Sequence, residues 1–344
     1  MKKLKIDVLC NDGSPLGVSE QSIHGLDGRM GVGGAELAIL TLMASWQNSG
    51  HEVTFYNNPL TSHGSVFRQL PMSLFIPKED RDILIIFRSP NKKIEHATGK
   101  KIWFSTDQYT VGNFNEFSTK VDEIVTISKF HAEYFKDTYG ISDTHVIDLP
   151  VRIWEYDGDI VQKKKNSFIF CSVPDRGLDI LADCYDELYR DIPNMALTIT
   201  SDYRLWGASS PLNEKHVRRF LNKPGVRFLG AVSRSQMIEE QRLAQFHAYP
   251  CTYEELFCYS SAECQIAGCY PITSSLGALS TTNMGTVLDG NPNSAEWKRK
   301  FIDTVSKAAS SPYTPAIAKE ISRAARDRFS LDKILPEWDK LFYD

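Results

Sequence analysis

The chain has 344 residues, of which 42% are hydrophobic and 24% are charged, and its formal net charge at pH 7 is -4. This length favours two domains, and the charge gives no reason to expect nucleic acid as a partner. The apolar runs are of strand length, far below the roughly 18 residues that a membrane span needs, so we expect no transmembrane segment.

The N-terminus carries basic residues but no apolar signal core, because Lys5 and Asp7 interrupt it, and it predicts a first buried strand. The seven cysteines are odd in number and include no Cys-x-x-Cys pair. Their spacing indicates neither a disulfide framework nor a thiolate zinc site, and the eight histidines show no metal-ligand spacing. We therefore expect a cytoplasmic protein with no metal and no cofactor.

The first half of the chain alternates apolar strand-like runs with helical patterns, which predicts a parallel sheet covered by helices. The clearest helix starts at Gly34, where Leu37, Leu40 and Met43 recur at helical spacing and Gly50 follows the end. The expected strands are residues 6–10, 53–56, 83–87, 101–104 and 123–127.

A polar stretch at residues 156–167 would make a poor core element, so we place the domain boundary there. A second set of elements follows, with strands at residues 168–171, 196–199, 226–229, 246–249 and 270–273 and helices at residues 178–190 and from Ser260. Two doubly wound α/β domains are implied. Residues 330–342 have one apolar face and predict a closing helix.

The most informative segment runs from residue 249 to residue 271, where a strand end meets Glu255 in a turn and Glu263 near the start of the next helix. Carboxylates accept hydrogen bonds from paired hydroxyls, and a helix N-terminus favours a diphosphate. The segment therefore predicts a site for a sugar linked to a nucleoside diphosphate.

The spacing Glu255-x7-Glu263, followed by Ala-Gly-Cys-Tyr-Pro-Ile at residues 267–272, resembles the signature of retaining GT-B glycosyltransferases, especially glycosyltransferase family 4. Phe257 matches the aromatic residue of that signature, while Leu256 and Cys258 stand where glycines are usual.

Three further segments resemble the same family in the same order. They are Gly-Val-Gly-Gly-Ala-Glu at residues 31–36, Asp-Glu-Ile-Val-Thr-Ile-Ser at residues 122–128 and Pro-Asp-Arg-Gly-Leu-Asp at residues 174–179. The resemblance implies the GT-B architecture, with two Rossmann-like domains facing a cleft and a final helix that crosses back to the first domain. It assigns residues 1–155 to an acceptor-binding domain, 156–328 to a nucleotide-sugar-binding domain and 329–344 to the closing helix.

The resemblance also implies roles for the acidic segment. Glu263 would bind the ribose hydroxyls of the nucleotide from the first turn of its helix, and Glu255 would contact hydroxyls of the transferred sugar. The backbone of Phe257, Cys258 and Tyr259 would approach the sugar and the diphosphate. The structural alternative for each glutamate is an acidic side chain with no ligand.

Arg176 would stabilise the charge that develops on the leaving diphosphate, since a guanidinium offers fixed donors to phosphate oxygens. The alternative is a surface arginine at a helix start. The second basic residue usual in the family is missing here, and Arg204 or Arg234 are weak substitutes. Gly33 and Gly34 precede the first long helix and would let its N-terminus approach the donor, although such a turn can also be purely structural.

Arg88 and Asp107 each follow a strand of the first domain, so either could orient an acceptor hydroxyl, or be an ordinary loop residue. Residues 157–159 read Asp-Gly-Asp, but they lie in the polar linker beside three lysines, and we expect them to be structural rather than a metal site.

The sequence thus predicts a retaining, metal-independent glycosyltransferase of the hexosyltransferase type, acting in carbohydrate biosynthesis. Its donor would be a nucleotide sugar, and its acceptor a glycan, a lipid-linked molecule or a protein, with peripheral membrane contact left open. The alternatives are a non-hydrolysing sugar-nucleotide epimerase and a non-catalytic carbohydrate-binding protein on the same fold.

Overall fold

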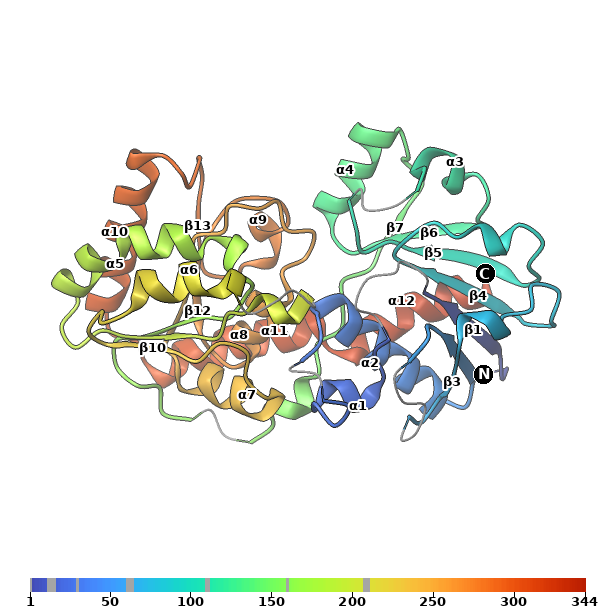
Figure 1. The fold of residues 1–344 in the computed structure, drawn as a ribbon, viewed down its shortest axis with the longest axis horizontal. Coiled ribbons are helices and arrows are strands. Elements are labelled where there is room, and N and C mark those ends of the chain that lie inside the picture. The colour runs from blue at the N-terminus through green and yellow to red at the C-terminus, as the bar shows by residue number, and fades with distance from the viewer. Residues whose placement is uncertain are drawn as a thin grey trace. The chain divides into compact units, whose positions relative to one another are not determined.

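The computed structural model describes residues 2–10, 17–28, 31–59, 65–108, 112–158, 161–206 and 211–344. It divides into two compact units (Figure 1). The first, called here the N-terminal domain, comprises Met1–Pro150 and Leu331–Asp344, and the second, the C-terminal domain, comprises Val151–Ser330.

The N-terminal domain is built on a parallel sheet of seven strands in the order β3-β2-β1-β4-β5-β6-β7. The strands are β1 (Lys5–Leu9), β2 (Glu52–Tyr56), β3 (Arg68–Leu70), β4 (Ile83–Phe87), β5 (Lys100–Phe104), β6 (Glu123–Thr126) and β7 (His145–Val146). Its α-helices are α1 (Glu20–Ile23), α2 (Gly34–Asn48), α3 (Phe114–Ser118), α4 (Lys129–Tyr139) and α12 (Leu331–Tyr343), with single 3-10 turns at η1 (Met72–Leu74) and η2 (Lys92–Ile94).

The closing helix α12 packs in the N-terminal domain, although it follows the C-terminal domain in sequence (Figure 1). Its Trp338 is fully buried, with ring centroids 5.3 Å from Trp46 of α2 and 5.0 Å from Phe104 of β5. Phe342 lies one turn further along and also contacts Trp46 at 5.3 Å. The predicted return of the last helix to the first domain is confirmed.

The C-terminal domain has a second parallel sheet, in the order β10-β9-β8-β11-β12-β13. The strands are β8 (Ser167–Phe170), β9 (Ala196–Ile199), β10 (Val226–Phe228), β11 (Phe246–Tyr249), β12 (Tyr270–Ser274) and β13 (Thr286–Leu288). The α-helices are α5 (Leu178–Asp191), α6 (Pro211–Phe220), α7 (Arg234–Leu243), α8 (Tyr259–Ile266), α9 (Leu279–Thr282), α10 (Ala295–Ser310) and α11 (Pro315–Phe329), and the 3-10 turns are η3 (Ile153–Tyr156), η4 (Pro174–Arg176) and η5 (Tyr203–Trp206).

Both sheets have the strand order of a doubly wound fold, so the predicted fold class of two Rossmann-like domains is confirmed. In such a sheet the first strand and the fourth lie side by side, and the order in which strands are added reverses between them. Ligands bind beyond the carboxyl ends of these two strands. The reversal lies between β8 and β11 in the C-terminal domain and between β1 and β4 in the N-terminal domain. Within the described ranges, no helix combines the length and the apolar character that a membrane crossing requires.

The observed division falls a few residues away from the predicted boundaries at 155/156 and 328/329. The backbone N-H of Val151 donates to the carbonyl of Phe329 at 2.9 Å, and the hydroxyl of Tyr156 donates to Gln241 at 2.5 Å. Residues 151–155 therefore belong to the C-terminal domain, because this segment is fixed to α7 and α11. Phe329 and Ser330 belong there as well, since Phe329 completes α11.

Candidate functional site

Arg176 and Glu255 occupy the point of reversal in the C-terminal domain. Arg176 ends the 3-10 turn η4, which follows β8, and Glu255 lies in the loop between β11 and α8. The Nε atom of Arg176 is 3.3 Å from Oε1 of Glu255, and both side chains are largely buried, at 17% and 16% exposure. The structure thus brings together two residues predicted independently from separate motifs.

Two tyrosines hold this pair in place. The guanidinium carbon of Arg176 lies 3.5 Å from the ring centroid of Tyr253, and the hydroxyl of Tyr249 donates a hydrogen bond to Glu255 Oε1 at 2.8 Å. Burial lowers the pKa of Arg176, but the charge of Glu255, together with Tyr249, Cys251 and Tyr253, outweighs burial and raises the pKa above the ordinary value. The guanidinium therefore stays charged, and its planar face is fixed by the ring beneath it.

Glycines let the loops around the pair approach each other closely. A Cβ atom at Gly177, where φ is +100°, would lie 2.0 Å from the carbonyl oxygen of Pro250. One at Gly277 would lie 2.3 Å from the carbonyl oxygen of Glu255, to which Gly277 is bridged. The Arg-Gly turn of the predicted motif is thus explained by close packing of η4 on the strand end of β11.

The N-terminus of α8 follows directly, capped by Cys258 in the left-handed region with φ +68°. The Cys258 side chain makes no capping hydrogen bond of ordinary geometry. Phe257 is buried with its ring 5.4 Å from that of Phe329, and Tyr259 is also buried. Cys258 therefore adopts the backbone conformation that a glycine would favour at this position of the motif.

Glu263 is in the second turn of α8, not in the first as predicted, because the helix already starts at Tyr259. Its carboxylate is 7% exposed and lies 2.5 Å from Nη1 of Arg234. Arg234 in turn contacts Glu155 at 2.6 Å, and Glu155 contacts Arg152 at the same distance. Burial raises the pKa of Glu263 although Arg234 opposes this.

Two basic residues were considered as a second phosphate ligand, Arg204 and Arg234. Arg234 is 10% exposed and forms ion pairs with Glu155 and Glu263. Arg204 is 43% exposed and donates to the buried carboxylate of Asp202 through Nε at 2.8 Å and Nη2 at 2.5 Å. Asp157 of the linker motif pairs with Arg326 at 3.2 Å, while Asp159 lies outside the described residues.

In the N-terminal domain, Arg88 directly follows β4 and pairs with Glu36 in the first turn of α2, with Nη2 2.5 Å from Oε1. The two side chains are only 16% and 11% exposed. Arg88 has φ +68°, and its backbone carbonyl accepts a hydrogen bond from Trp103 at 2.9 Å. Glu36 belongs to the Gly-Gly-Ala-Glu motif, and no role for its side chain was predicted.

The predicted residues Gly33 and Gly34 start this helix, with Gly33 as its N-cap. A Cβ atom at Gly33 would lie 2.3 Å from a carboxylate oxygen of Glu36. The glycine therefore makes room for Glu36 to turn back over the helix start, where its negative charge is favourable.

Asp107 lies in the loop after β5, and a buried histidine fixes its backbone. His131 Nδ1 accepts from the backbone N-H of Ile127 at 3.3 Å, so its Nε2 carries the proton and donates to the carbonyl of Asp107 at 3.2 Å. Burial lowers the pKa of His131 to about 3, which keeps this ring neutral. The carboxylate of Asp107 accepts from the backbone N-H of Gln108 at 2.7 Å.

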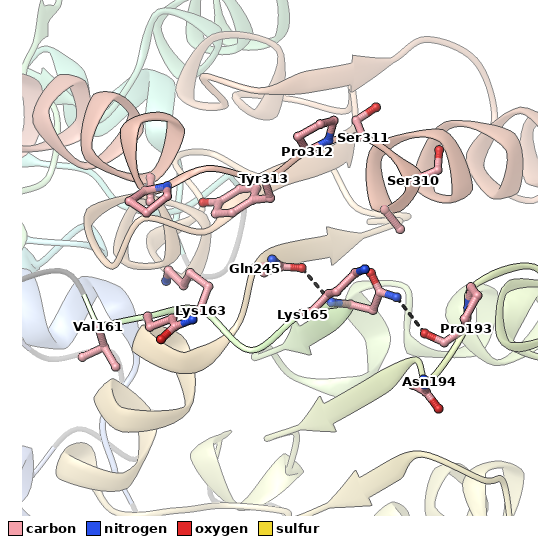
Figure 2. Close-up of a pocket in the computed structure, with 15 residues that line it drawn as sticks. Val161, Lys163, Lys165, Pro193, Asn194, Gln245, Ser310, Ser311, Pro312 and Tyr313 are labelled. Atoms are coloured by element: carbon pink, nitrogen blue, oxygen red, sulfur yellow. Dashed lines mark hydrogen bonds between the residues drawn. The ribbon is translucent and has the colours of Figure 1, made fainter.

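A hollow of about 1010 Å³ lies elsewhere on the C-terminal domain (Figure 2). Its lining includes Asn166 and Gln245, which directly precede β8 and β11, and Asn194, which lies just before β9. Tyr313, between α10 and α11, also lines it. The hollow is therefore at the amino ends of the strands. Ligands of doubly wound sheets bind at the opposite, carboxyl ends, so this hollow is distinct from the candidate site.

Comparison with solved structures places the whole chain in one architecture. A glycosyltransferase from Rickettsia africae ESF-5 matches with a TM-score of 0.71 at 15% identity, over 99% of this chain and 98% of that one. Sucrose-phosphate synthase from Thermosynechococcus elongatus matches with a TM-score of 0.72 at 14% identity, over 98% of both chains. HepE from Anabaena, solved in complex with UDP and glucose, matches with a TM-score of 0.68 at 14% identity, over 98% of this chain and 99% of that one.

No protein-family model matches the sequence, and no curated protein matches it either. The structural matches nevertheless extend over nearly the full length of both chains, and the solved proteins are glycosyltransferases of GT-B type. The chain therefore has the two-domain GT-B fold of these glycosyltransferases.

Proposed function

We propose that the protein transfers a sugar from a nucleoside-diphosphate sugar to an acceptor hydroxyl, with retention of the anomeric configuration. The observation that carries the proposal is the Arg176–Glu255 pair at the start of α8, beyond the carboxyl ends of β8 and β11. The GT-B fold supports it, because the solved relatives include a complex with UDP and glucose.

In this proposal the C-terminal domain holds the donor. Arg176 faces the diphosphate together with the N-H groups at the start of α8, and Glu255 accepts hydrogen bonds from hydroxyls of the transferred sugar. Glu263 binds the ribose hydroxyls, and its ion pair with Arg234 favours the ionised form that accepts such bonds. The fixed guanidinium of Arg176 then stabilises the charge that develops as the diphosphate leaves.

The N-terminal domain would hold the acceptor through Arg88 and Asp107. The acceptor oxygen bonds to the anomeric carbon as the bond from that carbon to the phosphate oxygen breaks. The acceptor proton passes to the leaving phosphate on the same face of the sugar. This route needs no protein base and no metal ion, and it leaves the protein to position the reactants and stabilise charge.

The proposal is tested by incubating the protein with UDP-, GDP- and ADP-sugars and a panel of glycan acceptors, and by measuring the released nucleoside diphosphate. We expect release with one donor, unaffected by EDTA, and a product whose anomeric proton coupling in NMR matches that of the donor. Conversion of the donor without any acceptor would favour an epimerase. A lack of both turnover and a donor-dependent thermal shift would exclude the proposal.

A further inference from the structure

Two cysteines and a histidine meet in the core of the C-terminal domain. Cys171 follows β8, His247 lies in β11 and Cys264 lies in α8, and all three residues are buried. The two sulfur atoms are 3.4 Å apart, and these sulfurs and a ring nitrogen of His247 all lie within 4.8 Å of one another. Because the three residues come from separate elements, no spacing in the sequence reveals them.

His247 supplies an independent reason to look for a ligand. The residue is fully buried, and neither ring nitrogen makes a hydrogen bond of ordinary geometry in the described part of the chain, although the ring interacts with the thiol of Cys171. Leaving a buried polar group without a partner is costly, and native structures rarely tolerate it. The ring is also fixed in orientation, since it stacks on Tyr249 with centroids 5.0 Å apart and planes 18° apart.

We propose that Cys171, His247 and Cys264 bind a zinc ion that ties β8, β11 and α8 together. Two thiolates and a neutral imidazole suit Zn²⁺, and together they cancel its charge, which reduces the cost of placing the ion in the core. A metal bond to one ring nitrogen also gives that nitrogen a partner. A disulfide between the two cysteines would leave both nitrogens of that histidine without a partner.

Structural zinc is usually four-coordinate, so a further ligand completes the site. The nearby thiol of Cys269 precedes β12 and hydrogen-bonds to the carbonyl of Gln241 at 3.0 Å. The side chain of Gln241 reaches Cys171, with Nε2 3.7 Å from Sγ. Cys269 also interacts with Cys264 and His247, so it is the candidate fourth ligand, although it lies outside the tight group of three.

The site has a structural role and takes no part in the proposed transfer reaction. Cys264 is adjacent to Glu263 in α8, and Cys171 directly follows β8, the strand that leads to Arg176. The zinc ion would fix the helix and the two strands that carry the donor-binding residues. Its presence can be tested without any assay of activity.

The test begins with the wild-type chain, unfolded in guanidinium chloride with reductant and a chelator, then refolded with either ZnCl2 or chelator. After desalting, zinc is counted by mass spectrometry and the Tm is measured. We expect about one zinc per chain after refolding with ZnCl2, and a higher Tm than after refolding with chelator. Refolding with CoCl2 should give the charge-transfer absorption of thiolate-bound cobalt.

Variants then assign the ligands. Cys171→Ala and Cys264→Ala should lose the zinc and the cobalt absorption, whereas Cys184→Ala, a buried cysteine of α5 in the same domain, should keep both. Loss in Cys269→Ala would identify the fourth ligand. The proposal is overturned by zinc-free wild-type protein after refolding with ZnCl2, by a full zinc content in Cys171→Ala, or by a Cys171–Cys264 disulfide in the folded chain.

Discussion

Arg176 and Glu255 form an ion pair at the carboxyl ends of β8 and β11, with Nε 3.3 Å from Oε1. The pair is asymmetric. The guanidinium is stacked on Tyr253, while the carboxylate receives a hydrogen bond from Tyr249. Each charged group therefore has a second partner, Tyr253 for Arg176 and Tyr249 for Glu255. A ligand that binds one of the two groups does not leave the other without a partner.

The first prediction concerns Arg176. Replacing Arg176 with alanine removes the fixed positive charge proposed to face the diphosphate, and we expect kcat to fall by about 100- to 1000-fold. Arg176→Lys should retain more of the wild-type kcat than Arg176→Ala but not all of it, because an ammonium group cannot stack on a ring and donate hydrogen bonds as a planar guanidinium does. The measurement is release of nucleoside diphosphate with the donor that the panel identifies.

Arg190→Ala is the matched control for this prediction, because Arg190 lies at the other end of α5 and its side chain is 69% exposed. Its activity should equal that of the wild type. Equal losses in Arg176→Ala and Arg190→Ala would contradict the assignment. Circular dichroism of both variants establishes that the domain is folded.

The second prediction concerns Cys258, which caps α8 with φ +68°. A side chain with a Cβ atom is strained in this region by about 1–2 kcal/mol, whereas glycine is not. Cys258→Gly and Cys258→Ala both remove the thiol, so they differ only in the Cβ atom. We expect the glycine variant to be more stable than the alanine variant by about 1 kcal/mol, measured by urea unfolding. Equal stabilities would show that the backbone relaxes without cost.

The sequence predicts the long interior elements well. The bounds of β4, β9 and β11 agree to the residue with the prediction. All residues of β4 and β11 are buried, whereas β9 alternates half-buried and buried residues, and both patterns are typical of strands. The edge strands β3 and β7 were missed, since they have three and two residues and both residues of β7 are exposed. Short exposed strands have little hydrophobic pattern to detect.

The candidate site was only partly predictable. The motifs located Arg176 and Glu255, whose contact follows from the order of the strands. They could not show that Glu263 is held by Arg234, or that Arg88 is held by Glu36, because these partners are far apart in sequence. The three residues of the proposed zinc site could not be predicted for the same reason, since they meet only when β8, β11 and α8 pack together.

The third prediction concerns Glu36 and Arg88. Their side chains are nearly buried, so removing either one leaves a charge poorly compensated. A double-mutant cycle with Glu36→Gln and Arg88→Met should give a coupling free energy of unfolding of about 2 kcal/mol.

The exposed pair of Glu214 and Arg218 in α6 serves as the control for this cycle, since its side chains are 63% and 75% exposed. Its coupling should stay near 0.3–0.5 kcal/mol, as is usual for such helix pairs. If the two cycles gave the same small value, Arg88 and Glu36 would not depend on each other.

The fourth prediction concerns the pH dependence of stability that His131 causes. Burial lowers the pKa of His131 to about 3 in the folded chain, whereas an unfolded histidine has a pKa of about 6.5. Between these values the unfolded state binds more protons, so stability falls as the pH falls from about 6.5 towards 3. From pH 7.5 to pH 5 this single group should cost about 2 kcal/mol.

His131→Gln removes the titrating ring and keeps a polar side chain at the position. The variant should be less stable than the wild type at pH 7.5, because it loses the fixed contacts to Asp107 and Ile127. The difference in Tm between variant and wild type should then narrow as the pH is lowered to 5, since only the wild type pays for keeping a neutral imidazole. A difference that stays constant over this range would mean that His131 has the same pKa in the folded and the unfolded chain, which would contradict the prediction.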